Sequence, residues 1–321
     1  MPEGDTVYRQ CAMLRAALAG QVLVSCDFRV PSLATSDVSD RTVLDVVPRG
    51  KHILIRLSAA PDCDAVRSGA EPLTLHSHLM MDGTWRVFDI APAKTARGRP
   101  QSYRRSPGGR SRAEAVRPLS YDVARGQGSH TVRAVLRTAR VEAVGFDVKD
   151  VRLVPTRLED QELVGHLGPD ILGPDWDLTE ALSRLRARPE RAIASALMDQ
   201  RNLAGIGNVY RVEVLFMTRT DPWAPVGSLS ERKLRELVVL AHKLLHLNRD
   251  RPLRSTIGEA PRGRPLHWAY GRDGRPCRRC GAVLRREEID DAALSLAEPL
   301  AATAAHHPRR IMWCPRCQAG D

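Results

Sequence analysis

Near the start of the chain, apolar residues recur with the spacing of a helix. This pattern predicts a helix over residues 4–19, whose single apolar face is formed by Val7, Cys11, Leu14 and Leu18. Asp5 or Thr6 is the candidate cap at its start, and Gly20 follows its end. The chain therefore opens with a short Pro-Glu-Gly lead into an amphipathic helix.

The next part of the chain has the texture of β-strands. Between residues 21 and about 90, short β-branched runs are separated by Gly, Pro and Asp; they read QVLVSCDF, TVLDVV, HILIRL, LTLHSH and TWRVF. The same texture returns at 131–155. We therefore expect an antiparallel β-sandwich domain over residues 1–156. Residues 91–128 are rich in Pro, Gly, Ser and Arg without apolar periodicity, which predicts a mobile insertion.

After residue 157 the apolar spacing becomes helical. The predicted helical segments lie near 159–166, 178–187, 190–199, 207–217 and 230–247. They would form a second domain over residues 157–260, followed by a cysteine module at 261–321. The expected fold class is α+β and multidomain: a leading helix, a β-sandwich, a helical domain and a small C-terminal hairpin.

Composition and charge narrow the class of protein. With 321 residues, 43% of them apolar and 27% charged, a disordered chain, a collagen and a coiled coil are disfavoured. The 49 basic and 38 acidic residues leave a net charge of +11, which suits a polyanionic partner. An arginine-rich proteome would also explain that bias. No apolar run approaches the roughly eighteen residues of a membrane span and no secretory signal is visible, so we expect a cytoplasmic, nucleoid-associated protein.

Two C-x-x-C pairs stand near the end of the chain. In a basic cytoplasmic protein they are better read as four thiolates on one structural Zn²⁺ than as disulfides; the ligands would be Cys277, Cys280, Cys314 and Cys317. Thirty-three residues separate the pairs, against about 15–20 in the usual zinc ribbon. The departure bears on the geometry of the site and not on the metal.

The sequence LAGIGN at 203–208 is a Gly-rich turn between two predicted helices. Gly205 and Gly207 would leave the first N–H groups of the next helix free for a phosphate, and Asn208 can add a side-chain amide. Such turns are also common without any ligand, so both interpretations stay open at this point.

His76 and His78 share one face of a predicted strand. A two-histidine metal site is conceivable, but a polar strand face near the domain cleft is the preferred interpretation because no third ligand stands nearby in sequence. Met80 and Met81 follow in a turn. They are either core filler or a flexible apolar wedge.

The first residues of the chain suggest covalent chemistry. If Met1 is removed, Pro2 becomes a free secondary amine, and an α-amine with a pKa near 7.7–8.0 is far more nucleophilic at neutral pH than a lysine near 10.4. Attack on a sugar C1′ would give an iminium, a fixed cation that acts as an electron sink. Glu3 could serve as general acid or base. Taken alone, these residues would merely start a helix.

Several motifs occur together and in order. They are MPEGDTV at the start, RGKHILI at 49–55, HSHLMMDGTWRV at 76–87, HLGPDIL at 166–172, LMDQRNLAGIGNVYRVEVLF at 197–216 and the paired cysteines. Together they resemble the Fpg/Nei family of DNA glycosylases over most of the chain outside 91–128 and 285–308. The start M-P-E-G is more similar to the endonuclease VIII (Nei) branch than to the formamidopyrimidine branch.

The resemblance implies the roles of several residues. Pro2 would be the Schiff-base nucleophile, Glu3 the acid that assists base loss, and Lys51 a contact to phosphate that assists β-elimination. Arg309 matches the zinc-finger arginine that assists δ-elimination, with Arg310 one position away as the alternative. The DNA contacts would be Met80, Met81, His166 and Asn208, with the methionines filling the gap left by an extruded nucleotide.

The implied activity is that of a bifunctional DNA glycosylase and AP lyase of base excision repair. It would act as a monomer on duplex DNA containing oxidised bases, most of all pyrimidines, or abasic sites. Two alternatives remain: an Fpg-like enzyme for oxidised purines, or a noncatalytic zinc-containing DNA-binding protein. Asp5-Thr6 stands where the family usually has Pro-Glu, which leaves the second acidic residue displaced or absent.

Overall fold

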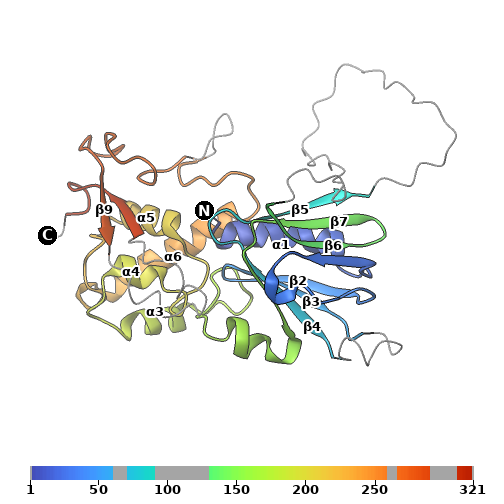
Figure 1. The fold of residues 1–321 in the computed structure, drawn as a ribbon. Coiled ribbons are helices and arrows are strands. Elements are labelled where there is room, and N and C mark those ends of the chain that lie inside the picture. Colours follow the sequence, from blue (N-terminus) through green and yellow to red (C-terminus); the bar gives the residue numbers. More distant parts are fainter. Residues whose placement is uncertain (1, 61–70, 91–129, 259–265, 290–308, 320–321) are drawn as a thin grey trace, which may run out of the picture.

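The computed structural model describes residues 2–60, 71–90, 130–258, 266–289 and 309–319. The chain forms two lobes, a β-rich lobe and a helical lobe that carries the C-terminal hairpin, and the N-terminus lies where they meet (Figure 1). The expected α+β architecture is confirmed. The predicted insertion at 91–128 lies outside the described residues.

The first helix follows its hydrophobic pattern. Helix α1 spans Gly4–Leu18 and buries the predicted apolar face against the β-lobe. Its N-cap is Glu3, in an extended conformation, so the expectation that Asp5 or Thr6 caps the helix is wrong. Both lie inside the first turn, where the Asp5 carboxylate has other partners. Gly20, with φ +76, lets the chain leave the helix.

Two antiparallel four-stranded sheets form the sandwich. One has the order β1-β6-β7-β5 and the other β2-β3-β4-β8. The strands are β1 (Ser25–Phe28), β2 (Val43–Arg49), β3 (His52–Leu57), β4 (Leu73–His78), β5 (Thr84–Asp89), β6 (Val132–Arg137), β7 (Val141–Phe146) and β8 (Asp150–Pro155). Their apolar positions and α1 share one core, which includes Ile53, Leu75 and Trp85. Each predicted strand run is confirmed.

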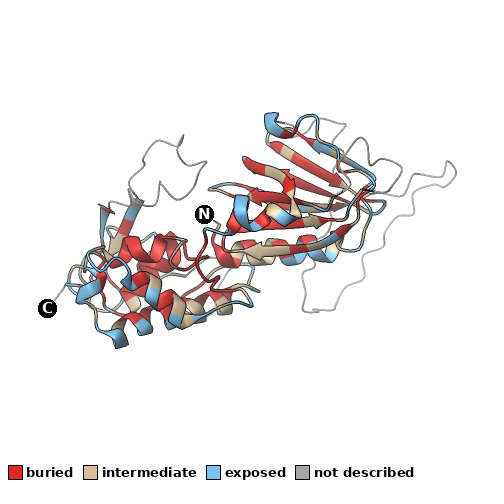
Figure 2. Ribbon diagram, turned by 90° about the horizontal axis from the view of Figure 1, so that it is seen from below, coloured by how far each residue is buried: buried red, intermediate tan, exposed pale blue. Residues whose placement is uncertain are grey.

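The helical lobe is built on α5, which is buried almost throughout its length. Its helices are α3 (Leu178–Arg186), α4 (Ile193–Met198), α5 (Asn208–Met217) and α6 (Glu231–Asn248). Asp177 caps α3 and Ser230 caps α6 through side-chain oxygens. Buried residues run through these helices and the sheets (Figure 2).

One predicted helix is replaced by a wider, irregular turn. Residues expected to form a helix over 159–166 form a single π-helical turn, Asp160–Val164, which the Gly165 N–H closes on the Asp160 carbonyl at 2.6 Å. Such turns, closed from residue i+5 back to residue i, occur mostly singly and not as long helices. This segment leads from the sandwich into the helical lobe.

The hairpin at the end of the chain pairs strand β9 (Arg285–Ile289) with β10 (Arg309–Trp313). Ile311 is fully buried in the core of the helical lobe, so the hairpin is attached to α5 and does not stand apart. None of the helices in the described part of the chain has the length and apolar character needed to cross a membrane.

Candidate active site at the junction of the two lobes

Glu3 ties the start of the chain to the helical lobe. Its fully buried carboxylate accepts the Gly207 N–H at 3.0 Å and the Val209 N–H at 2.7 Å, with the Tyr210 N–H at 3.4 Å. The carboxylate therefore caps α5, whose N-cap residue, Gly207, has no side chain to do so. Pro2, half-buried, immediately precedes this anchor.

The Gly-rich turn is shaped by this contact. The Gly4 N–H donates to the Gly205 carbonyl at 2.9 Å, and Gly205 has φ +106. A Cβ added at Gly207 would lie 2.3 Å from Glu3 Cδ, so only glycine lets the carboxylate approach. The expectation that the first N–H groups of α5 stay free for a phosphate is wrong for Gly207 and Val209, which bind Glu3 instead.

The same turn supports the hairpin that carries Lys51. Gly50, with φ +58, donates its N–H to Asp170 Oδ2 at 2.7 Å, and a Cβ there would lie 2.9 Å from Ala204 Cβ. The other Asp170 oxygen accepts the Leu172 N–H at 3.0 Å. The turn at 203–207 therefore contacts both Glu3 and the residue before Lys51. Asp170 lies in the HLGPDIL motif, but its sequence neighbours give no sign of this contact.

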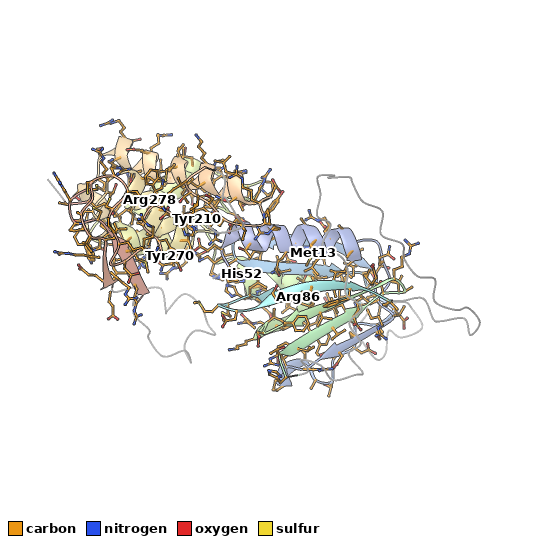
Figure 3. All side chains as sticks on the ribbon, turned by 90° about the horizontal axis from the view of Figure 1, so that it is seen from above. Met13, His52, Arg86, Tyr210, Tyr270 and Arg278 are labelled. Atoms are coloured by element: carbon orange, nitrogen blue, oxygen red, sulfur yellow. The ribbon has the colours of Figure 1, made fainter. Side chains whose placement is uncertain are left out.

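Four histidines gather beside Lys51. The Nδ1 atom of His52 lies 2.8 Å from Nε2 of His76, and the ring centroid of His52 lies 5.0 Å from that of His78 and 6.3 Å from that of His166. His52 lies at the edge of the β-lobe that faces the helical lobe (Figure 3). Burial, followed by the charges of His78 and His76, holds the pKa of His52 well below its ordinary value.

For His76 and His78 the sequence left two interpretations, a two-histidine metal site and a polar strand face. Among the described residues, the only group of three or more metal-ligating side chains close enough to share an ion is the cysteine group. His76 is buried and His78 is half-buried, in line with the preferred interpretation of a polar strand face at the cleft.

Met80 and Met81 occupy the turn between β4 and β5. The side chain of Met81 is exposed, and Met80 has φ +51, a left-handed conformation that is unfavourable for a residue with a side chain. The Met80 N–H donates to His78 Nδ1 at 3.0 Å, which fixes the turn next to the histidines. His166, also exposed, stands near the same group.

Asn208 links α5 to the hairpin. Its side-chain amide donates to the Arg310 carbonyl at 3.0 Å, while its oxygen accepts from Arg211 Nε at 3.1 Å and Nη2 at 2.6 Å. Asn208 thus fixes the backbone next to Arg309. The backbone of Arg309 begins β10, but its side chain lies outside the described part of the structure, and Arg310 is exposed.

A buried ionic group next to Glu3 is the main feature that the sequence did not indicate. The Arg254 guanidinium donates to the Asp5 carboxylate, which also accepts the Tyr210 hydroxyl at 3.0 Å. Asp5, at the position where the family usually has another residue, is therefore bound on both sides by buried polar groups. No local pattern marks Arg254, because its partner lies 249 positions earlier in the chain.

The four cysteines form a candidate metal centre. All four sulfur atoms lie within 4.8 Å of one another, with Cys277 and Cys317 4.0 Å apart and Cys280 and Cys314 3.5 Å apart. A tetrahedral thiolate site with bonds of about 2.3 Å would separate its sulfurs by about 3.8 Å. The donor set and its spacing therefore fit such a metal, in spite of the long segment between the pairs.

Comparisons with known proteins agree with this arrangement. The chain matches the formamidopyrimidine-DNA glycosylase N-terminal domain over residues 1–117 and the formamidopyrimidine-DNA glycosylase H2TH domain over 167–248. It is 44% identical over 320 residues to a probable endonuclease 8 2 of Streptomyces coelicolor, covering 100% of this chain and 95% of that protein. It is 38% identical to the DNA-(apurinic or apyrimidinic site) lyase Nei2 of Mycolicibacterium smegmatis, covering 100% of both.

The fold is also that of a solved structure. Formamidopyrimidine-DNA glycosylase of Lactococcus lactis, non-covalently bound to DNA containing an AP site, superposes with a TM-score of 0.67 at 19% identity, covering 99% of this chain and 100% of that one. The domain matches and the full-length identities extend the likeness from the fold to the sequence. The chain belongs to the formamidopyrimidine-DNA glycosylase and endonuclease 8 family.

Proposed function

We propose that this protein is a bifunctional DNA glycosylase and AP lyase that acts from a processed N-terminal Pro2. The observation that carries the proposal is the anchoring of Glu3 on the first turn of α5, which holds the adjacent proline at the junction of the lobes. The turn that receives Glu3 also supports the hairpin of Lys51. A nucleophile, an acid and a lysine thus meet around one turn.

The chemistry follows from the secondary amine. The Pro2 nitrogen attacks C1′ of an extruded nucleotide, the C1′–base bond breaks, and the base leaves with a proton that Glu3 can deliver or relay. The sugar ring opens and the amine becomes an iminium. Loss of a C2′ proton then expels the 3′ phosphate, a second elimination expels the 5′ phosphate, and water releases the sugar fragment and regenerates the amine. Lys51 and Arg309 would assist these two eliminations.

Binding of DNA would use both lobes. Met81 at its exposed turn, with Met80, fills the gap left by the extruded nucleotide, while His166, Asn208 and Arg309 lie near the phosphates. These contacts supply affinity, and selectivity begins with the lower cost of extruding a damaged base. We assign residues 1–156 to the catalytic sandwich, 157–260 to the helical DNA-binding domain and 261–321 to the zinc-finger module.

Zinc is the metal that we assign to the four cysteines. Four thiolates leave no open position for water, so the ion would hold the hairpin together and take no part in the reaction. The hairpin is joined to α5 through the Asn208 contact to Arg310, which supports a role in presenting Arg309 to a phosphate.

Trapping with borohydride tests the covalent step. Wild-type protein incubated with DNA that contains an abasic site or an oxidised pyrimidine should give a stable adduct, because borohydride reduces the iminium to an amine. Pro2→Gly, or a protein that retains Met1, should suppress the adduct. DNA binding without any adduct in the wild type would favour the noncatalytic alternative.

The substrate proposal is an oxidised pyrimidine, in line with the endonuclease 8 names of the relatives. Single-turnover excision from duplexes containing thymine glycol, dihydrouracil or 8-oxoguanine tests this choice. Faster excision of either pyrimidine lesion is the expected outcome. A clear preference for 8-oxoguanine would assign the protein to oxidised purines and leave the catalytic residues unchanged.

A further inference from the structure

A buried guanidinium lies between the two acidic residues at the start of the chain. Arg254 Nη1 is 3.6 Å from Glu3 Oε1, while Nε donates to Asp5 Oδ2 at 2.8 Å and Nη2 donates to Asp5 Oδ1. The side chain of Arg254 is 12% exposed and those of Asp5 and Glu3 are 1% and 0% exposed. Two carboxylates beside the candidate nucleophile therefore share one cation away from water.

Asp5 holds the guanidinium more firmly than Glu3 does. The two donors of Arg254 form a fork on Asp5, the arrangement in which an arginine and a carboxylate bind most strongly. Tyr210 completes the group, since its hydroxyl donates to Asp5 at 3.0 Å and its ring lies 4.9 Å from the guanidinium carbon. Arg254 is thus fixed without help from Glu3.

The Asp5 carboxyl is ionised in this group. Burial by itself would raise the pKa of the Asp5 carboxyl, but the hydrogen bond and charge of Arg254 and the hydroxyl of Tyr210 outweigh it, and the pKa is lowered. Asp5 therefore stays ionised and keeps the cation in place at neutral pH. The other titratable groups facing these carboxylates are Arg9, Tyr210, His267 and Tyr270.

Glu3 needs such a neighbour if it is to act in base excision. The hydrogen bonds that reach it from α5 come from neutral backbone N–H groups, and they constrain its position but add no full charge. We propose that Arg254, held by Asp5 and Tyr210, is a positioning residue that orients the Glu3 carboxylate and balances its charge while the base departs. This inference rests on the proposed function.

Three variants separate this role from simple support of the fold. Arg254→Gln removes the cation, Arg254→Lys restores a charge without the fork, and Asp5→Asn leaves the cation with Glu3 as its remaining acidic partner. The matched control is Arg41→Gln, because Arg41 is another buried guanidinium, bound to the Ser58 and Glu71 carbonyls in the sandwich. For each protein we would measure melting temperature, single-turnover excision against pH, and borohydride trapping on a preformed abasic site.

Arg254→Gln and Asp5→Asn should shift the pH profile of excision in opposite directions. Arg254→Gln should slow excision about tenfold to a hundredfold and move the alkaline limb of the pH profile up by about one unit, since loss of a cation favours the protonated acid. Asp5→Asn should move that limb down, because Arg254 then balances Glu3 alone. Arg254→Lys should return the limb towards its wild-type position, and Arg41→Gln should leave it unchanged.

Trapping on a preformed abasic site tests the proposed function separately from the role of Arg254. That substrate has already lost its base, so Arg254→Gln should trap within about threefold of the wild type. A wild type that forms no adduct overturns the proposed function. A wild type that excises and traps, with an Arg254→Gln profile that coincides with it, overturns only the inference. If Arg254→Gln does not fold, a limb that stays in place in Asp5→Asn overturns the inference equally.

Discussion

At position 207 the main chain passes so close to Glu3 that no side chain can be accommodated. Alanine there would place its Cβ 2.3 Å from Glu3 Cδ and push the carboxylate off the N–H groups of Gly207 and Val209. We expect Gly207→Ala to lower single-turnover excision about a hundredfold, since a displacement of about 1 Å can cost that much. The measurement is base release from a lesion-containing duplex under enzyme excess.

A second glycine provides the control for this substitution. A Cβ at Gly227 would lie 2.9 Å from Pro189 Cβ, also a close contact, but within the helical lobe and away from Glu3. Gly227→Ala should therefore lower the melting temperature and leave excision by the folded protein close to wild type. Equal losses of excision in both variants would show that the effect comes from the fold and not from Glu3.

The residues that the sequence did and did not indicate differ in how far away their partners lie. Pro2 and Glu3 carry their chemistry in their own atoms and their place at the chain start, so the sequence alone suggests what they do. The roles of Arg254 and Asp170 depend on contacts with Asp5 and Gly50, which lie 249 and 120 positions away. No periodicity or short motif records such a pairing.

Helix α5 connects Glu3 to the C-terminal hairpin beside the four cysteines. Glu3 caps its first turn, and Asn208 in the same turn binds the Arg310 carbonyl of β10. Regular apolar spacing predicted α5 and the strands. The π-helical turn at 160–164 was not predicted, because apolar spacing over so few residues does not distinguish it from an α-helix.

Loss of the metal should therefore release the hairpin from α5. We expect about one zinc ion per wild-type chain, a much lower content in Cys314→Ser, and weaker binding of lesion-containing DNA by that variant. Elemental analysis and fluorescence anisotropy measure the two effects. Cys26→Ser, at a cysteine in β1, is the control and should keep both. Wild-type affinity in zinc-depleted Cys314→Ser would exclude the hairpin from DNA binding.

The buried histidines at the junction should make the stability of the protein depend on pH. Burial, with the charges of His78 and Arg152, lowers the pKa of His76 from 6.5 to about 3. The unfolded chain then binds a proton that the folded chain does not, so stability present above pH 6.5 falls as the pH drops towards 3. From pH 7 to pH 5 this residue should cost about 2 kcal/mol of unfolding free energy.

Denaturation in urea at these two pH values checks this prediction. His76→Gln should lose less free energy of unfolding between pH 7 and pH 5 than the wild type, whatever its stability at pH 7. His130→Gln, at an exposed histidine, should keep the wild-type dependence. An undiminished loss in His76→Gln would mean that other groups, and not this buried ring, govern the acid response.

The net charge of +11 should attract DNA to the protein as a whole, and the salt dependence of binding distinguishes the cations that contact phosphates. Each phosphate neutralised adds about −0.9 to the slope of log affinity against log salt. Lys51 stands at the junction beside the histidines, whereas Lys243 is exposed on α6. Lys51→Ala should reduce the slope by about one, and Lys243→Ala should leave it unchanged, although both variants lose one positive charge. Equal changes in the two slopes would mean that DNA binding responds only to net charge. The proposal that the duplex binds at the junction would then be wrong.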